Sequence, residues 1–244
     1  MAKTLLAQAE MMEQRYARQT VNGADLQVAS IRTVVAMRAY LEYYRRYIAD
    51  KPCYEAGYYE ASFDNVIECV YHRSFSLGLI MYYTGQKAFI ENYAYLRELN
   101  FVEVGTVPLY VIFSRSNPLA NKEKINSDDI QDLTYVTYSD FKHSILDLHN
   151  ECKLINMSMP SKLLYVHDRH ALMNTLSTTR SFALAHHFTR EDEDRYQLVS
   201  VPAADRKFRV HFGYVYPKGT AFGPDSNEQK FFQIYRQVVE TFDR

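Results

Sequence analysis

The residues best suited to chemistry in this sequence form two clusters of histidines. His167, Asp168, Arg169 and His170 are consecutive at a predicted strand-to-helix junction. The two histidines, three positions apart, could therefore approach a metal ion or a ligand carboxylate. A structural interpretation is stronger, because Asp168 can cap a helix over 169–178 and leave His170 on its exposed face. We predict no metal ion at this junction.

The second cluster is His186 and His187, which end a predicted strand over 181–185. Adjacent side chains on a strand point to opposite faces, so the two imidazoles cannot easily bind one ion. One of them, for which we take His186, can instead face a binding cleft.

No reactive constellation of the kind used by enzymes is evident. The sequence contains no G-x-S-x-G, H-E-x-x-H, G-x-G-x-x-G or phosphate-binding G-x-x-x-x-G-K-[ST] motif. Its three cysteines, Cys53, Cys69 and Cys152, are too widely spaced for a C-x-x-C pair. Their odd number also argues against a disulfide framework and favours a reducing cytoplasm. We predict that the chain is not an enzyme and uses no cofactor.

Binding is the better supported role, and polar or aromatic residues follow several predicted strands. Ligands of doubly wound α/β domains lie beyond the carboxyl ends of the strands, where helix N-termini attract anions. A small organic acid could place its carboxylate near Ser30 and the N-terminus of a helix over 33–48, although helix capping explains the same residue types. The predicted ligand-binding residues are Ser30, Arg32, Thr33, Ser62, Phe63, Tyr83, Ser139, Phe141, His167 and His186.

The elements that must position these residues alternate between strand and helix in two series. The first series has strands over 26–30, 53–59 and 75–81, and helices over 34–48, from 62, and near 87–99. The second has strands over 107–114, 134–138, 162–166, 181–185 and 208–216, with helices over 127–133, 141–152, 169–178 and 226–243. This alternation is typical of a doubly wound α/β fold.

The composition is that of an ordinary globular protein. The 244 residues are 47% hydrophobic and carry a net charge of −1, which gives no general electrostatic reason to bind nucleic acid. No run of 18 apolar residues predicts a membrane span, and the first 19 residues lack the apolar core of a signal peptide.

One segment of the chain resembles a known family. Val107 to Ala120 (VPLYVIFSRSNPLA), followed by Ile125 to Leu133, resembles LysR-type transcriptional regulators, in which a strand is followed by a "PLA" turn, a short helix and another strand. The resemblance extends over nearly the whole chain. It implies two Rossmann-like subdomains with a cleft between them, similar to type II periplasmic binding proteins.

The resemblance also implies boundaries and a role. Residues 1–20 would be the linker helix, 24–104 with 212–244 effector subdomain I, and 105–211 effector subdomain II. The chain would sense a small organic or aromatic acid and form a homodimer or homotetramer in the cytoplasm. It would contact no membrane, and it would reach DNA only through a helix-turn-helix domain that this sequence lacks.

The sequence departs from the family pattern at three places. Ser76 stands where an acidic residue is usual, and Thr178 to Ser181 replace a glycine-rich turn at the cleft. Ser62 also lies one residue before the family's frequent Ser/Thr, a position that Phe63 holds here. A solute-binding protein of a transporter remains the alternative, but it would need an export signal or a lipid-anchor cysteine, and the sequence has neither.

Self-association is expected from two apolar stripes. One runs along the predicted first helix at Leu5, Ala9, Met12 and Tyr16. The other is a set of tyrosines, Tyr40, Tyr43 and Tyr47, that cannot all enter the core if the stripe from Val34 to Ile48 already faces it.

Overall fold

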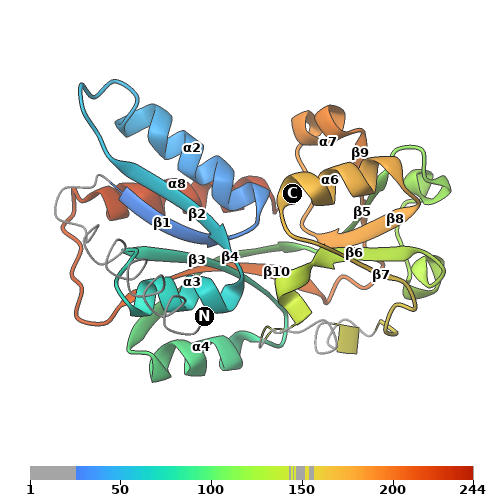
Figure 1. The fold of residues 1–244 in the computed structure, drawn as a ribbon, viewed down its shortest axis with the longest axis horizontal. Coiled ribbons are helices and arrows are strands. Elements are labelled where there is room, and N and C mark those ends of the chain that lie inside the picture. The colour runs from blue at the N-terminus through green and yellow to red at the C-terminus, as the bar shows by residue number, and fades with distance from the viewer. Residues whose placement is uncertain (1–25, 143, 145, 147–151, 154–156, 244) are drawn as a thin grey trace, which may run out of the picture.

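The computed structural model describes residues 26–142, 144, 146, 152–153 and 157–243. In this part of the chain the strands form two five-stranded sheets, each covered by helices (Figure 1). We call the sheet with strand order β2-β1-β3-β10-β4 sheet A, and the sheet with order β7-β6-β8-β5-β9 sheet B. Each sheet with its helices is a lobe, lobe I for sheet A and lobe II for sheet B.

Sheet A combines parallel strands from the first part of the sequence with an antiparallel strand from the last part. β1 pairs parallel with β2 and β3, whereas β10 inserts between β3 and β4 and is antiparallel to both. Its strands are β1 (Leu26–Ile31), β2 (Ala56–Ala61), β3 (Leu77–Tyr83), β4 (Leu99–Pro108) and β10 (Arg209–Pro217).

Helices cover both faces of sheet A. On one face α2 (Val34–Tyr47) packs beside α8 (Asn227–Thr241), and on the other lie α3 (Phe63–Tyr71) and α4 (Lys87–Leu96) (Figure 1). The all-apolar character of β3, with Leu77, Leu79 and Ile80 almost fully buried, follows from this double cover.

Lobe II is built in the same way on a smaller scale. β6 pairs parallel with β7 and β8, and β5 lies antiparallel between β8 and β9. The strands are β5 (Tyr110–Ser114), β6 (Thr134–Tyr138), β7 (Leu163–Val166), β8 (Ser181–Ala185) and β9 (Leu198–Pro202), and the helices are α6 (Arg169–Thr178), α7 (Arg190–Tyr196) and the short 3-10 helices η1 (Pro118–Asn121), η2 (Ser127–Ile130) and η3 (Ser139–Lys142).

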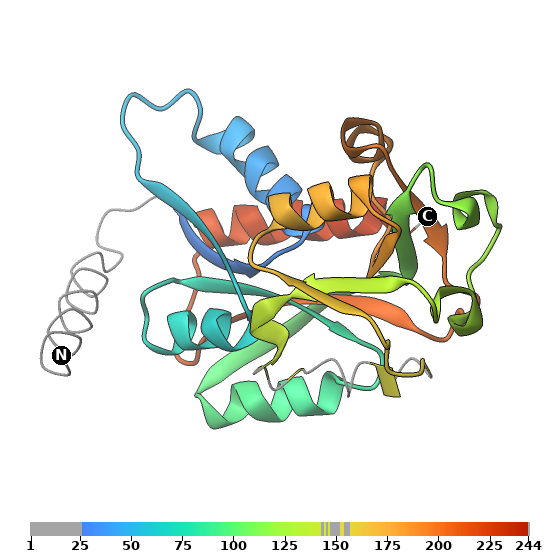
Figure 2. The ribbon, with the colours of Figure 1, turned by 45° about the vertical axis from the view of Figure 1, so that its right-hand side comes forward.

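Two short crossovers join the lobes. The chain passes from β4 to β5 through Leu109 alone, and returns from β9 to β10 through 203–208. The two crossovers are tied to each other where the Ala203 amide donates to the Leu109 carbonyl at 3.0 Å. Figure 2 shows the arrangement with lobe II turned toward the viewer.

The expected α/β fold with two sheets is confirmed, but several elements differ from the sequence prediction. The third strand begins at Leu77 and includes Tyr83, which was expected to follow it. The helix expected over 127–133 is the four-residue 3-10 helix η2, and β4, β9 and α7 were not predicted. The predicted linker helix over 1–20 and most of the helix over 141–152 lie outside the described residues.

The buried face of α2 was predicted only in part: Val34 and Ile48 are buried as expected, and the three tyrosines do not all enter the core. Tyr40 and Tyr43 are buried, whereas Leu41 is 41% exposed and Tyr47 37% exposed. The core face is set by α8 and β2, because the Tyr43 ring meets Phe231 edge-on and the Tyr40 ring lies 5.0 Å from that of Tyr58.

Candidate functional site

A small pocket lies between the two lobes, beyond the carboxyl ends of β1, β2 and β6. It encloses about 100 Å³ and is lined mainly by apolar and aromatic side chains. Lobe I contributes the residues that follow β1 and β2 and the end of β3, and lobe II contributes β6, β8, α6 and the turn after β6. The alternation of strand and helix in each lobe therefore brings both sets of strand ends to one site.

Two helix caps form part of the lobe I wall. The Thr33 hydroxyl accepts a hydrogen bond from the Ala36 amide at 3.0 Å and begins α2. The Ser62 hydroxyl accepts from the Asn65 amide at 3.2 Å and begins α3. Both helices therefore direct the positive ends of their dipoles at the pocket, which favours a negatively charged ligand group.

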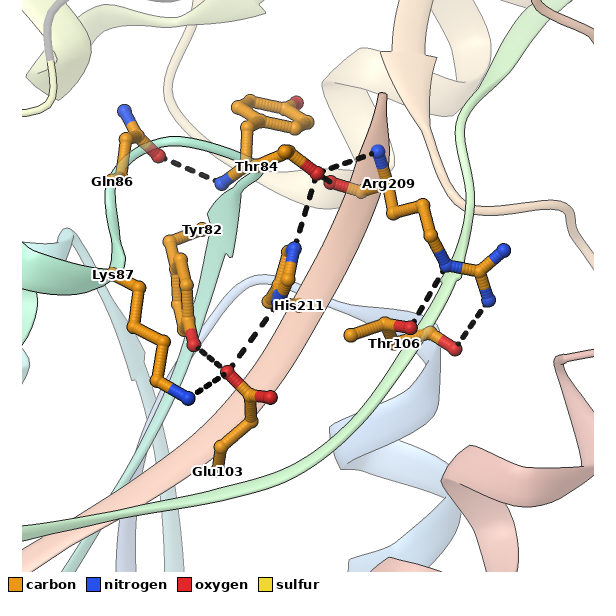
Figure 3. Close-up of polar contacts among 9 residues, drawn as sticks. Tyr82, Thr84, Gln86, Lys87, Glu103, Thr106, Arg209 and His211 are labelled. Atoms are coloured by element: carbon orange, nitrogen blue, oxygen red, sulfur yellow. Dashed lines mark hydrogen bonds and ion pairs between the residues drawn. The ribbon is translucent and has the colours of Figure 1, made fainter. Parts of the chain in front are cut away.

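Tyr82 closes the same wall and carries a polar network on its hydroxyl (Figure 3). This hydroxyl donates to Glu103 on β4, which also meets Lys87 Nζ at 3.3 Å and His211 Nδ1 at 3.4 Å. Burial raises the pKa of Glu103, but hydrogen bonds from Tyr82 and Lys87 outweigh it, so the pKa lies below its usual value. Glu103 is a carboxylate at neutral pH.

The network continues from Tyr82 to the crossovers (Figure 3). The His211 ring stacks on Tyr82 at 4.9 Å between centroids, and its Nε2 lies 3.1 Å from the Thr84 hydroxyl. Thr84 accepts from the Arg209 amide at 3.0 Å, and the Arg209 guanidinium donates to the Thr106 hydroxyl at 2.8 Å and to the Thr106 carbonyl at 2.9 Å. Arg209 is the first residue of β10, directly after the 203–208 crossover, and Thr106 lies near the end of β4, shortly before the crossover at Leu109.

His186 lies at the lobe II side of the pocket and is buried among aromatic rings. Its neighbours are Phe188, Phe212 and Phe242, and its Nδ1 lies 2.7 Å from the His187 carbonyl. Desolvation lowers the pKa of His186 to about 4, so the imidazole is neutral at pH 7. It can exchange hydrogen bonds with a ligand but supplies no positive charge.

Arginines supply the positive charge, and both are paired across the lobes. Arg32 of lobe I lies 2.7 Å from Asp140 of lobe II, and its guanidinium stands over the Tyr138 ring at 4.8 Å. Arg169 of lobe II lies 2.5 Å from Glu60 of lobe I. Desolvation raises the pKa of Glu60, although Arg169 opposes the shift.

Seven of the ten predicted site residues line this pocket, and three lie elsewhere. Ser30, Ser139 and His167 are not part of the lining. Ser30 is fully buried and donates to the Ile31 carbonyl, so Ile31 takes the place at the pocket that was expected for Ser30. The residues that line it are Arg32, Thr33, Ser62, Phe63, Tyr83, Phe141 and His186.

The histidine junction folds as the structural interpretation predicted. Asp168 caps α6 by accepting from the Ala171 amide at 2.8 Å, and His170 is exposed. His167 Nδ1 lies 2.9 Å from the Ser139 hydroxyl. Among the described residues no group of three or more metal-binding side chains is found.

Sequence reasoning missed Gln86, Tyr138 and Arg169 as lining residues. The Gln86 side chain accepts from the Tyr83 amide at 2.7 Å and holds the turn after β3. Arg169 was available from its place at the start of a predicted helix, since that position faces the same edge of the sheet as Asp168. Its role depends on Glu60 in the other lobe, which no local pattern reveals.

Comparison with known proteins identifies a family for this chain. The family model described as the LysR substrate binding domain matches residues 87–239. No curated protein sequence matches this chain significantly. In the part of the chain that the structure describes, no helix has the length and apolarity needed to cross a membrane.

Solved structures with the same fold are similar over most of the chain. The effector-binding domain of QuiR in complex with shikimate is 14% identical with a TM-score of 0.59, and the match covers 90% of this chain and 99% of that one. The BenM effector-binding domain with its effector benzoate is 13% identical with a TM-score of 0.60, and the match covers 90% of this chain and 94% of that one. The reduced regulatory domain of OxyR2 from Vibrio vulnificus is 16% identical with a TM-score of 0.58, and the match covers 90% of this chain and 97% of that one.

Proposed function

This chain belongs to the LysR substrate binding domain family, with the fold of type II periplasmic binding proteins, and from this premise we propose that it senses a small organic acid in the pocket between its lobes. The observation that carries the proposal is the pocket itself, where an apolar interior meets Arg32 and the N-termini of α2 and α3 at one edge.

The size of the pocket favours a ligand with no more than one ring. Apolar cavities near 150 Å³ hold a benzene-sized molecule, whereas drug-sized ligands need roughly 300 Å³ or more. The pocket here, at about 100 Å³, suits an aliphatic acid or a single aromatic ring with little rearrangement. Phe63, Tyr82, Tyr83 and Phe141 provide the aromatic walls.

Two relatives support the chemical class. QuiR is described with shikimate and BenM with benzoate, and both ligands are single-ring carboxylates. At 13–14% identity these structures show a shared fold, so the ligand of this chain is proposed from its own pocket residues together with that likeness.

The test is a thermal-shift screen of small aliphatic and aromatic carboxylates, followed by calorimetry on the acids that stabilise the protein. Arg32→Gln removes the guanidinium at the pocket edge, and we expect acid affinity to fall by about ten- to a hundredfold, the range for a charge-assisted hydrogen bond. Arg115→Gln is the matched control, because Arg115 pairs with Asp194 within lobe II. Full affinity in Arg32→Gln would place the acid group elsewhere.

We further propose that the protein is not an enzyme and acts in the cytoplasm as a homodimer or homotetramer. Its exposed Leu41 and Tyr47 on α2 provide apolar area for self-association. DNA would be reached only through a helix-turn-helix domain joined to this chain. Sedimentation at tens of micromolar tests the assembly, and a monomer would contradict it.

A further inference from the structure

Two ion pairs cross the cleft in opposite directions. In one, the arginine comes from lobe I and the carboxylate from lobe II (Arg32 and Asp140), and in the other these are reversed (Arg169 and Glu60). All four side chains are largely shielded from solvent, with exposed fractions of 16% and 26% in the first pair and 22% and 20% in the second. Partly buried pairs of this kind are weakly screened by salt, so they resist lobe separation.

The pair between Arg169 and Glu60 is firmly anchored. Glu60 lies inside strand β2 and also receives the Tyr58 hydroxyl at 3.4 Å, and Arg169 donates in addition to the Thr33 carbonyl at 3.4 Å. Both partners are held by regular elements, because Arg169 is the first residue of α6.

The pair between Arg32 and Asp140 is incomplete. Asp140 lies in the four-residue 3-10 helix η3, and only its Oδ2 contacts Arg32, at 2.7 Å. Its Oδ1 is buried and has no hydrogen-bond partner among the described residues. A buried acceptor without a donor is costly, so this contact is the weaker of the two.

Each pair contributes its arginine to the lining of the ligand pocket, and the weaker pair holds Arg32 there. Arg32 lines the pocket, as do Tyr138 and Phe141 on either side of Asp140, and their two rings stack at 6.5 Å. An acid that enters the pocket therefore meets an arginine already bound to a carboxylate of the protein.

We propose that Asp140 occupies Arg32 in the free protein as an internal substitute for the acid group of the effector, and that binding exchanges one carboxylate for the other. The exchange releases η3 from lobe I while the pair between Arg169 and Glu60 stays closed as the pivot. The effector's identity as an acid rests on the proposed function, whereas the latch formed by Arg32 and Asp140 is a property of the protein alone.

The latch can be tested without any ligand, by measuring the distance between spin labels on the two lobes. Labels at the exposed Cys53 in lobe I and at Lys122→Cys in lobe II report the separation. Asp140→Asn keeps the shape of the side chain and removes its charge, and we expect it to shift or broaden the distance distribution. Asp194→Asn, which breaks a pair of 2.5 Å within lobe II, is the matched control and should leave the distribution unchanged. Thermal melting establishes that each variant is folded.

An Asp140→Asn distribution that matches those of the wild-type and the control overturns the latch. A second arm measures the affinity for benzoate by calorimetry, and the internal competitor predicts binding about tenfold tighter in Asp140→Asn than in the wild-type. Undetectable benzoate binding in both proteins, with a shifted distance in Asp140→Asn, would count against the proposed acid and leave the latch standing. Weaker benzoate binding in Asp140→Asn would contradict the exchange.

Discussion

At the scale of single residues, His186 shows how a pocket side chain acquires its chemistry from its surroundings. Its ring is enclosed by Phe212 of β10, by Phe242 at the end of α8, and by Phe188 in the segment between β8 and α7. Elements from both lobes therefore hold this imidazole in its neutral form, and its protonation must disturb the contact between them.

We expect the protein to lose stability in mild acid because of this histidine. The pKa of His186 is about 4 in the folded protein against 6.5 when unfolded, so the unfolded state binds more protons between these values. The stabilisation is complete above pH 6.5 and is lost as the pH falls towards 4, by up to about 3 kcal/mol in the free energy of unfolding. Urea unfolding at pH 7.5 and at pH 5 measures this loss in the free energy of unfolding.

A variant separates this residue from the other histidines. His186→Phe preserves an aromatic ring and should flatten the pH dependence, while the exposed His170→Gln should not change it. The pKa values of His187 and His211 are also lowered by desolvation, so a residual slope of the same sign is expected. An unaltered slope in His186→Phe would refute the assignment.

At the scale of elements, α3 packs tightly against β3 in lobe I. A Cβ on Gly78 would lie within 2.8–2.9 Å of Val66, Val70 and Val215. The absence of a side chain at this point is what lets the helix approach the sheet and place Ser62, its N-cap, at the pocket.

Gly78→Ala should therefore be destabilising by about 1–3 kcal/mol, as expected for overpacking of a filled core. Gly223→Ala is the matched control, because nothing lies within 4 Å of a Cβ there and no positive φ is involved. The difference in denaturation midpoint between the two variants measures the predicted destabilisation. Equal midpoints would mean that α3 can move away from the sheet at no cost in free energy.

Sequence patterns predicted elements well where a short stretch of the chain carries the signal. The cap at Asp168 and the strand over 75–81, which corresponds to β3, were predicted in this way. The core face of α2 was predicted only in part, because the burial of Tyr40 and Tyr43 depends on β2 and on α8, and α8 lies far away in the sequence. β4 escaped detection because most of its side chains are only partly buried and show no alternation.

The site residues also differ in whether a local sequence pattern reveals them. Seven lining residues could be predicted because each lies at the end of a strand, directly after one or near the start of a helix, positions that local patterns reveal. The pairing of Arg169 with Glu60 and of Arg32 with Asp140 could not be predicted, because these contacts form only when the two lobes meet.

At the scale of the whole molecule, Arg209 links segments that lie far apart in the sequence. It begins β10, and its guanidinium donates twice to Thr106 near the end of β4 and forms an ion pair with Asp243 after α8. Its backbone amide donates to the Thr84 hydroxyl at 3.0 Å. The guanidinium thus links β10 to β4 and to the segment after α8, and the Arg209 amide connects through Thr84 and His211 to Tyr82 at the pocket wall.

Arg209→Lys should loosen the crossovers, because an ammonium group cannot reproduce the two parallel bonds of the guanidinium. We expect faster amide hydrogen exchange at 106–107 and 209–211 in sheet A, with exchange in sheet B unchanged. Arg206→Lys, at an exposed position three residues earlier, is the control. Equal exchange rates in the two variants would show that the backbone pairing alone holds the crossovers.

The insertion of β10 between β3 and β4 has a consequence for how the protein is made. Synthesis delivers β3 and β4 early, but they share no ladder until β10 arrives, after all of sheet B has been produced. The ribosome therefore exposes a complete set of lobe II strands while lobe I still has two open edges. Lobe II can mature during translation, whereas the pocket can form only once the last strand and α8 have left the exit tunnel.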